Sequence, residues 1–576
     1  MKERKLPASV SRGMSYLLIF LPVALGFAYV RMFGVDVPHY DTWSMVPYFE
    51  KFSSGTLTLR DLFMLHNEHR IVFPRIAMLL LGTVTAFDNV AIMNLTQVCL
   101  VITLVTILLA VRSSVTANPI FFVAIPFLVF TWGQIWNMLQ AFQITLIFAQ
   151  TFSVLTFYLL YVSGFERFRK IAFPGALLTG TVASFSAALG LLVWPVGFLQ
   201  ILISSVEKTV KGFLAGAWGL VGLAEWIVYF HDYEKPDNMS SHYLSDGFLT
   251  SIEYFLTALG ASLFREGPAP VAGVLLIGLI AASLLFVYRD RELGKCSFWI
   301  SLLPFSLLIL ASTTLARGGS GIEDALNSKY VTFSILAVIG AYAMLVRSAL
   351  EHRKPVTTIS LGILTALIVS SIPVSYAEEL NNARIIEKRK EQAAFVLATY
   401  RSQPDEVMVR FFRRSPEASR HRASVLETLG YSVFSEPRPG VLPPTLSDLS
   451  PARARILYDI ETISGVEVSS EDLPVVIPED ESSINVVGWA VDAEARNTAG
   501  GVYVVIDGEP IPAFYGMSKE DVAERLGSRT NEYSGFWRAI PIEEIGPGTH
   551  ELSIIIVTHD GEGYYRPDRK IVFIVE

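Results

Sequence analysis

The chain has 576 residues, of which 52% are hydrophobic and only 17% charged, and its mean hydropathy is +0.44. These values exclude an ordinary soluble globule and indicate a polytopic α-helical membrane protein. The formal net charge of -8, without a block of Lys and Arg, argues against a nucleic-acid partner. The two cysteines, Cys99 and Cys296, lie in or beside apolar runs, so we expect them to pack there rather than to form a disulfide.

The first apolar run follows the basic stretch MKERK and reaches from Met14 to Val30. It has the basic flank of a signal sequence but no small-residue cleavage site after it, so we predict an uncleaved first span. Ten further runs are long enough to cross the hydrocarbon core, which makes about eleven spans. They are residues 90–111, 119–137, 141–163, 171–188, 189–206, 212–230, 269–287, 297–315, 330–347 and 356–376.

Basic residues in short loops mark the cytoplasmic side of a membrane. With eleven spans every basic cluster falls on one side: MKERK, Arg112, and residues 166–170, 207–211, 289–295 and 347–354. A crossing by the doubtful segment Ile71–Phe87 would put MKERK opposite the other clusters. We therefore predict that this segment lies on or dips into the outer leaflet. The N-terminus is then cytoplasmic, and the loop 31–89 and the C-terminal third are extracytoplasmic.

The stretch HNEHRIVFPRI, residues 66–76, places two arginines at the start of an apolar run that faces outward. Arg70 and Arg75 here, and Arg317 and Lys329 in a later outer loop, run against the bias that keeps basic residues inside. All four stand next to apolar spans rather than at loop tips. Ionisable side chains at such a depth indicate a functional site.

The long outer loop opens with VPHYDTWSMVPYFEKFSSGTL, in which Asp41 follows soon after the first span. In this arrangement residues 1–376 resemble the GT-C superfamily of polytopic glycosyltransferases, which includes the protein mannosyltransferases and the aminoarabinose transferases of lipid A. The chain is also similar to a group of bacterial membrane proteins that share a YDxW and HNEHR arrangement. The resemblance implies a GT-C-like transmembrane domain in the bacterial inner (plasma) membrane.

The resemblance also implies an inverting transfer of a sugar from a polyprenyl-phosphate donor to an extracytoplasmic glycan, lipid or protein acceptor. Asp41 is the implied catalytic base, because a carboxylate can take the proton of the acceptor hydroxyl. The departing lipid phosphate needs cationic donors at headgroup level. The residues predicted to bind substrate there are His66, Glu68, His69, Arg70, Arg75, Arg317 and Lys329. Many family members carry a paired acid where Thr42 follows Asp41, so we expect no cofactor, with a divalent metal as the alternative.

Structural explanations of these residues stay open beside the functional ones. Asp41 can be an ordinary helix N-cap. His66 and His69 can pair with Glu68 or cap a turn, and metal binding by the two histidines is conceivable, although no closed ligand set is evident. Arg70 and Arg75 can extend to lipid headgroups without binding a substrate.

The outer loop from Trp132 to Gln143 carries aromatic and amide side chains and no charge. We predict that it faces the sugar, because planar rings stack on sugar faces and amides satisfy hydroxyl groups. An aromatic belt at the membrane surface explains the tryptophans as well. The residues assigned to substrate binding in this loop are Trp132, Trp136, Asn137 and Gln140.

The composition changes after about Tyr376. Residues 377–450 predict an extracytoplasmic connector, with a charged helix from Glu378 to Tyr400 and a Pro-rich stretch at 435–448. Residues 451–576 predict a small extracytoplasmic β-sandwich with hairpin turns at Asp507-Gly508 and Asp560-Gly561. It resembles a domain appended to bacterial glycosyltransferases and cell-surface proteins. The predicted strands lie within 484–492, 501–508, 535–542, 549–561 and 569–576.

Two other classes of protein fit an apolar chain with outward cations. A transporter or flippase of lipid-linked sugars would show repeated halves or charges at mid-membrane, neither of which the sequence displays. A non-catalytic scaffold for envelope assembly would leave the charged first loop unexplained. Both remain alternatives to the enzyme, and an oligosaccharide polymerase or ligase is a further possibility within the enzyme class.

Overall fold

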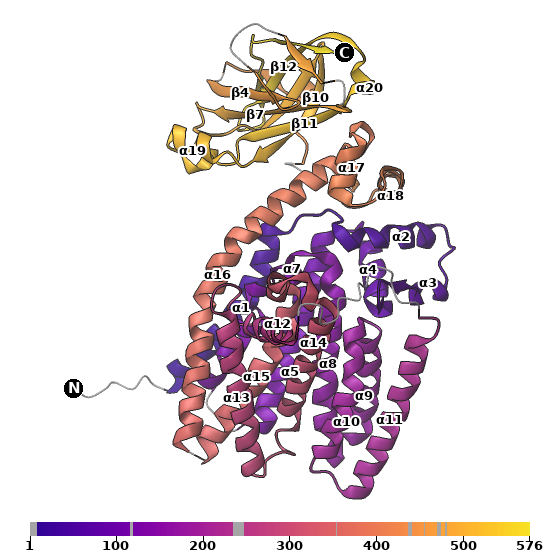
Figure 1. Ribbon diagram of the computed structural model, residues 1–576, viewed down its shortest axis with the longest axis vertical. Coiled ribbons are helices and arrows are strands. Elements are labelled where there is room, and N and C mark those ends of the chain that lie inside the picture. The colour runs from indigo at the N-terminus through magenta and orange to yellow at the C-terminus, as the bar shows by residue number, and fades with distance from the viewer. Residues whose placement is uncertain are drawn as a thin grey trace, which may run out of the picture. The chain divides into compact units, whose positions relative to one another are not determined.

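The computed structural model describes residues 8–115, 119–233, 247–352, 354–435, 441–453, 455–468, 474–478 and 481–576. The predictions made for MKERK, for most of the loop 231–247 and for part of the stretch 435–448 lie outside the described residues. By their internal contacts the residues form two compact units (Figure 1). Unit 1 is Met1–Gly34, Lys51–Thr85 and Asn89–Arg384, and unit 2 is Val35–Glu50, Ala86–Asp88 and Ile385–Glu576.

Unit 1 is a helical bundle whose described part holds eight stretches long and apolar enough to cross a membrane, by length and composition. All eight coincide with predicted spans. They are Asn89–Ser114 (α5), Pro119–Leu139 (η2, α6, η3 and α7), Ala141–Ser163 (η4 and α8), Lys208–Phe230 (α11), Ala269–Arg289 (α13), Ser297–Ser320 (α14 with η6), Ser328–His352 (α15) and Pro355–Ala398 (α16).

The other three predicted spans fall on helices that are too short or not apolar enough to meet the same criterion of length and composition. Within α1 (Ala8–Phe33), the described side chains form a shorter apolar helix from Leu17 to Phe33. Helix α9 (Glu166–Ser184) begins with the charged residues ERFRK, and α10 (Val193–Ile203) has only 11 residues. The total of eleven spans therefore stays a prediction.

The doubtful segment 71–87 forms the short helix α4 (Val72–Val84) of 13 residues. At a rise of about 1.5 Å per residue, this helix is about 20 Å long. The hydrocarbon core of a bilayer is about 30 Å thick. The length of α4 therefore agrees with the prediction that this segment does not cross.

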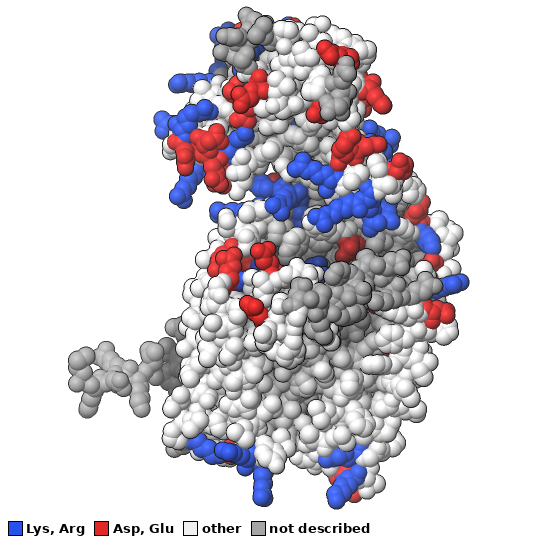
Figure 2. Space-filling view, viewed as in Figure 1, with Lys and Arg blue, Asp and Glu red and all other residues white. Residues whose placement is uncertain are grey.

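The basic loops of unit 1 meet at one end of the bundle, where Figure 2 shows Lys and Arg side chains. Arg347 Nη2 lies 2.7 Å from Glu292 Oε2, and its Nη1 donates to the carbonyl of Ser114 at the end of α5. Gly294 lies so close to Ser205 that an added Cβ would collide with the Ser205 hydroxyl. The loops at 112, 205, 292 and 347 therefore share one end, as the charge pattern predicts. The assignment of that end to the cytoplasm stays a prediction.

Helix α15 is the most enclosed of the eight stretches, because 94% of its apolar segment is buried inside the protein. It packs against α13 and α14. A Cβ on Gly340 would stand 2.8 Å from the carbonyl oxygen of Trp299, so only glycine permits α14 and α15 to approach this closely. Hydroxyl groups on the same helix, such as that of Thr332, accept hydrogen bonds from the neighbouring loop.

Unit 2 contains a single curled sheet of twelve strands in its described part, in the order β3-β13-β12-β9-β10-β11-β7-β4-β5 with β6, β8 and β14 beside this path. Its two halves bury a common core, to which Val486 and Ile460 contribute from one half and Val504 and Ile554 from the other. The predicted separate two-sheet sandwich is not confirmed. The strands are β3 (Ser450–Pro451), β4 (Ile456–Ile463), β5 (Val466–Glu467), β6 (Val475–Ile477), β7 (Ser483–Asp492), β8 (Asn497–Thr498), β9 (Gly501–Ile506), β10 (Glu509–Met517), β11 (Gly535–Pro541), β12 (Gly548–Val557), β13 (Gly563–Tyr565) and β14 (Ile571–Val575).

Strand β10 joins the two halves because it pairs with β9 over its first part and with β11 over its second. Pro510 and Pro512 lie in the part that pairs with β9 alone, where a missing N–H on the other side breaks no ladder. The register shifts between Tyr515 and Met517, at Gly516 with φ 118°. The strand passes from one half of the sheet to the other between Ala513 and Phe514, and the bulge bends it just beyond this point.

The predicted hairpin turns are both present. Asp507 and Gly508 have φ 50° and 91° and form the two-residue link between β9 and β10. Asp507 Oδ1 accepts the Glu551 N–H at 2.9 Å, and Oδ2 lies 2.7 Å from His550 Nδ1. In the second turn, Gly561 has φ 74° and Asp560 Oδ1 accepts the hydroxyl of Thr558 at 2.6 Å.

The connector predicted for 377–450 does not begin where a helix ends. Helix α16 continues from Pro355 to Ala398, so it contains both the last predicted span and the predicted charged helix. Unit 2 then adds α17 (Asp405–Phe412), α18 (Pro416–Leu429), α19 (Glu520–Leu526) and α20 (Ile542–Ile545). The segment with Asp41 also belongs to unit 2, as η1 (Tyr40–Met45) and the start of α2 (Val46–Ser53).

The buried Arg538 of β11 holds the curled sheet to the chain after α16. Its Nη2 donates to the carbonyl of Ser402 at 3.0 Å and to the hydroxyl of the same residue at 2.7 Å, and the guanidinium lies 5.8 Å from the ring centroid of Phe395. Burial lowers the pKa of Arg538 to about 10, so the group stays charged at neutral pH.

We expect Arg538→Met to lower the free energy of unfolding of unit 2 by about 2–4 kcal/mol, because it leaves buried acceptors without a charged donor. Thermal unfolding of the full chain in detergent measures the change. The exposed Arg525, which lies over the Trp489 ring at 4.8 Å, is the matched control. An Arg525→Met variant that loses as much stability as Arg538→Met would contradict a special role of Arg538.

Candidate functional site

The stretch HNEHR folds as a tight hairpin of β1 (Leu65–His66) and β2 (His69–Arg70). Asn67 takes the left-handed conformation at its turn, with φ 52°. Asn is one of the few residues that adopt this conformation readily, because its short polar side chain can hydrogen-bond locally. The hairpin follows α3 (Leu59–Phe63) and leads directly into α4.

Arg70 ties the hairpin to the end of α11. Its Nε donates to the carbonyl of Tyr229 at 2.7 Å and its Nη1 to the carbonyl of Phe63 at 2.7 Å, and its Nη2 donates to the carbonyl of His231. The backbone N–H of Arg70 also donates to the hydroxyl of Tyr229 at 3.0 Å. Arg70 is only 9% exposed. Most of its donors therefore serve the protein itself.

Arg75 on α4 has the same kind of role and is only 1% exposed. Its Nη1 points at the carbonyl end of α3, where it donates to Leu62, to Met64 at 3.2 Å and to Asp61 at 3.3 Å. A cation at the carbonyl end of a helix is favourable because those carbonyls have no partner within the helix. The predicted phosphate contact of Arg75 gains no support from this geometry.

The two histidines of the hairpin pack against different loops of unit 1. His69 Nδ1 accepts the backbone N–H of Ala188 at 3.3 Å, and its Nε2 lies 3.6 Å from Glu68 Oε1. The ring of His66 lies 4.6 Å from that of Phe142. Among the described residues, no group of three or more His, Cys, Asp or Glu is placed to hold a metal ion.

Other predicted residues also meet around this hairpin. Arg317 interacts electrostatically with Tyr330 and Asp324, and also with Glu68 of the hairpin. The hairpin therefore lies near the loop after α14. Arg317 is exposed and Lys329 half-buried. The segments that sequence analysis assigned to one outer face therefore gather at one end of unit 1.

The amides of the Trp132–Gln143 loop face helices rather than solvent. Asn137 is fully buried, and its Nδ2 donates to the carbonyl of Lys329 at 3.1 Å and to the Thr332 hydroxyl at 2.9 Å. The backbone N–H of Trp136 donates to the Ser328 hydroxyl at 3.2 Å. Gln140 is only 2% exposed. These contacts fix the loop to the start of α15.

Trp132 has both faces of its ring covered. The ring of Tyr29 stacks on it at 4.3 Å and that of Tyr376 at 4.4 Å. This arrangement gives no support to the stacking of a sugar on Trp132, which stays a prediction. Trp136 is half-buried and keeps its place as a candidate.

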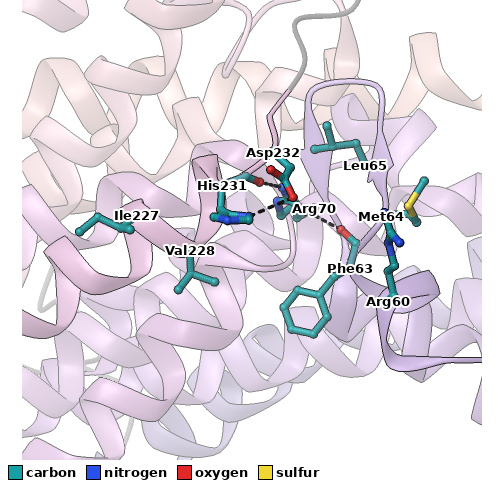
Figure 3. A pocket seen from close by; sticks show the side chains of 9 residues that line it. All are labelled: Arg60, Phe63, Met64, Leu65, Arg70, Ile227, Val228, His231 and Asp232. Carbon is teal, nitrogen blue, oxygen red and sulfur yellow. Dashed lines mark hydrogen bonds and ion pairs between the residues drawn. The ribbon is translucent and has the colours of Figure 1, made fainter.

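A cavity of about 790 Å³ opens beside Arg70 and the carbonyls that it binds (Figure 3). In Figure 3, Ile227 and Val228 of α11 lie on one side and Arg60 and Met64 on the other. Ile227 is 62% exposed and Val228 53%, so the cavity meets an uncovered apolar stretch of a candidate span. Its lining residues are Arg60, Phe63, Met64, Leu65, Arg70, Ile227, Val228, His231 and Asp232.

The sequence predicts a role for Arg70 but not for Arg60, His231 or Asp232, which also line the cavity. Arg60 is exposed, and its side chain makes no ion pair or side-chain hydrogen bond within the described parts of the chain. It is the second residue of α3, which a capping box of Thr58 and Asp61 begins. The hydrogen bond from Lys51 holds the pKa of Asp61 well below its usual range. A hint was present in the sequence, since His231 and Asp232 are the first polar residues after an apolar run.

Asp41 lies in the first turn of η1, in unit 2. His39, not Asp41, is the N-cap of this helix, so the simplest alternative explanation of Asp41 does not apply. Asp41 is half-buried, and its backbone carbonyl accepts the Ser44 hydroxyl at 2.6 Å. An acid in a first helical turn is also favoured by the helix dipole.

Comparison with known proteins shows one distant similarity. An uncharacterized protein of Archaeoglobus fulgidus is 23% identical over 199 residues, which cover 32% of this chain and 50% of that protein. The chain thus spans about half the length of the curated relative that it matches. No family model matches the chain, and no solved structure matches it significantly.

The carbonyl contacts make Arg70 and Arg75 structural, and a conservative substitution tests this. Lysine keeps the charge but cannot reach several carbonyls at once. We expect Arg75→Lys and Arg70→Lys each to raise amide exchange over residues 58–71 about tenfold or more, since each lost charge-assisted hydrogen bond costs about 1.5–3 kcal/mol. Arg31→Lys, at the exposed end of α1, is the control. Unchanged exchange in both variants would return the two arginines to ligand binding.

Proposed function

We propose that the chain is a membrane glycosyltransferase of the GT-C type, which moves a sugar from a polyprenyl-phosphate donor to an extracytoplasmic glycan, lipid or protein acceptor. The observation that supports this best is the cavity beside Arg70. It combines an apolar wall from a candidate membrane helix with cationic side chains. A lipid phosphate has the complementary parts, a hydrocarbon chain and an anionic head.

The polyprenyl chain would lie along the apolar wall. Ile227 and Val228 are uncovered on α11, and Phe63 and Leu65 extend the wall toward the hairpin. Contact of apolar groups with a hydrocarbon chain needs no directional partner, which suits a long and flexible lipid. The end of α11 at Phe230 marks where the wall gives way to polar residues.

The phosphate would lie at Arg60, whose side-chain donors bind no other group in the described parts of the chain. A guanidinium can hold two phosphate oxygens at once. Three of the five N–H groups of Arg70 donate to carbonyls, so Arg70 adds positive charge and shape to this end of the cavity. We therefore assign the main phosphate contact to Arg60 and the positioning of the loop to Arg70.

Asp41 remains the proposed base, on the ground of the family resemblance. A base is needed because the acceptor hydroxyl must lose its proton as it attacks the sugar carbon. In the proposed orientation the end of unit 1 with the hairpin is extracytoplasmic, where polyprenyl-phosphate sugars replace nucleotide sugars as donors. The end with Arg347 and Glu292 is then cytoplasmic.

Binding of a polyprenyl monophosphate to the full chain tests the cavity without knowledge of the sugar. We expect Arg60→Ala to weaken binding about tenfold or more, because one charge-assisted hydrogen bond contributes about 1.5–3 kcal/mol. Native mass spectrometry in detergent gives the bound fraction. Arg167→Ala, which removes an exposed arginine at the start of α9, should bind as the wild type does. Equal binding by all three proteins would sink the assignment of the phosphate to Arg60.

The proposed base is tested by Asp41→Asn, which keeps the size of the side chain and removes its basicity. We expect the transfer of sugar from labelled polyprenyl-phosphate donors in membranes to fall by about two orders of magnitude or more, at unchanged protein abundance. Asp448→Asn, an exposed acid of the same unit, serves as the control. Transfer within a few-fold of wild type in the Asp41 variant would leave that acid with a structural role only.

A further inference from the structure

Helices α17 and α18 of unit 2 carry an unusual concentration of arginine. From residue 410 to residue 422 there are five arginines against one acid, Glu417. Helix α17 ends at Phe412, and Arg413 takes the left-handed conformation with φ 54°. Ser415 then caps α18 by accepting the Ala418 N–H. This short turn brings arginines of both helices together, and Figure 2 shows Lys and Arg side chains gathered where Figure 1 labels α17 and α18.

One arginine of α18 and another just before α17 have carboxylate partners, in contrast to the rest. Arg401, just before α17, lies 2.6 Å from Glu427, and Arg420 lies 2.7 Å from Asp405. Arg420 also donates to the carbonyls of Tyr400 and Gln403. These residues hold the two helices together and need no external anion.

The other arginines form an unpaired group, which we call the arginine face: Arg410, Arg413, Arg414 and Arg422. Within the described residues none of the four is in an ion pair with a carboxylate. Arg410 and Arg413 are exposed. Burial, and next the charge of Arg414, lower the pKa of Arg422 to about 10. Arg414 and Arg422 are thus close enough to repel each other, and an anion would relieve that repulsion.

The arginine face is built on the segment that contains Asp41. The guanidinium of Arg413 lies over the ring of Tyr40 at 4.7 Å, and Arg422 Nη1 donates to the carbonyl of Trp43 at 2.9 Å. The ring of Trp43 packs edge-on against Phe412 at 4.7 Å. Tyr40 follows Phe33, the last residue of the apolar helix α1, by only seven residues. The arginines therefore rest on a segment that leaves an apolar helix directly.

Apolar and aromatic groups accompany the charges. Val409 is 44% exposed and Tyr40 37% exposed. Arg410 lies over the ring of its neighbour Phe411 at 5.7 Å. Exposed aromatic and aliphatic side chains between arginines are typical of surfaces that lie against lipid headgroups, where the rings enter the interface and the guanidinium groups meet phosphates.

We propose that the arginine face binds the phosphates of anionic membrane lipids. It holds α17, α18 and the Tyr40–Trp43 segment at a lipid surface, and this role is independent of the proposed sugar transfer. Lipid phosphate fits better than a soluble anion because the charges alternate with exposed apolar side chains, which a soluble anion would leave in water. Each basic residue near an anionic surface strengthens the association about fivefold, and salt weakens it.

The test uses the full chain in nanodiscs of phosphatidylcholine alone or with one quarter phosphatidylglycerol. Amide exchange over residues 405–429 reports on the face locally, so other lipid contacts of the chain do not enter. We expect phosphatidylglycerol to slow this exchange at least fivefold at low salt, and 1 M salt to remove most of the effect. A variant with Arg410, Arg413 and Arg414 all changed to Gln should lose the protection. The side chains of these three donate no hydrogen bond within the described residues, so the helices should remain intact in phosphatidylcholine.

The matched control removes the same charge from another part of unit 2, with Arg496, Arg525 and Arg529 changed to Gln. Protection by phosphatidylglycerol that persists in this control and vanishes in the arginine-face variant supports the proposal. Equal protection in both variants overturns it. Inorganic phosphate, or a soluble acidic polysaccharide, is added to the phosphatidylcholine nanodiscs as a further arm. If either slows exchange as much as phosphatidylglycerol does, the face binds soluble anions and the lipid assignment is wrong.

Discussion

The candidate site depends on one requirement: a guanidinium that is nearly buried must find acceptors for its donors. Arg70 meets it with the carbonyls of Tyr229, Phe63 and His231. Phe63 is close to Arg70 in the sequence, whereas the other two lie about 160 residues further along the chain. Loss of these contacts would leave a charge without partners in apolar surroundings, which is costly. The Arg70 side chain consequently links the hairpin to the end of α11, and the cavity lies beside this link.

Periodicity and length predicted most of the helices and strands, and the misses have physical reasons. Eight of the predicted spans match long apolar stretches, because twenty apolar residues in sequence have few alternatives to a membrane helix. Strand β10 was missed because Pro510 and Pro512 argue against a strand, and only its one-sided pairing permits them. The charged helix after Tyr376 was separated from the preceding span by composition, although α16 continues through both.

The candidate site was predicted less well, because residue type does not reveal the partner of a side chain. Arg75 and Arg60 look alike in sequence, yet Arg75 donates to carbonyls of α3 while Arg60 lines the cavity. Trp132 was assigned to a sugar from its type, and two tyrosines from distant parts of the chain cover its ring. Such pairings depend on long-range packing. Sequence position does place the polar loops together at one end of unit 1, which the charge pattern predicted.

The shared strand β10 also constrains how unit 2 acquires its structure. It pairs with β9 as far as Ala513 and with β11 from Phe514 onward, so neither half of the sheet can complete its ladder without it. The shared core joins Val504 to Val486 across the curl. We therefore expect the two halves of the sheet to fold together rather than one after the other. A chain that stops before β12 would leave the edge of β9 without its partner strand, and such an edge can pair with another chain.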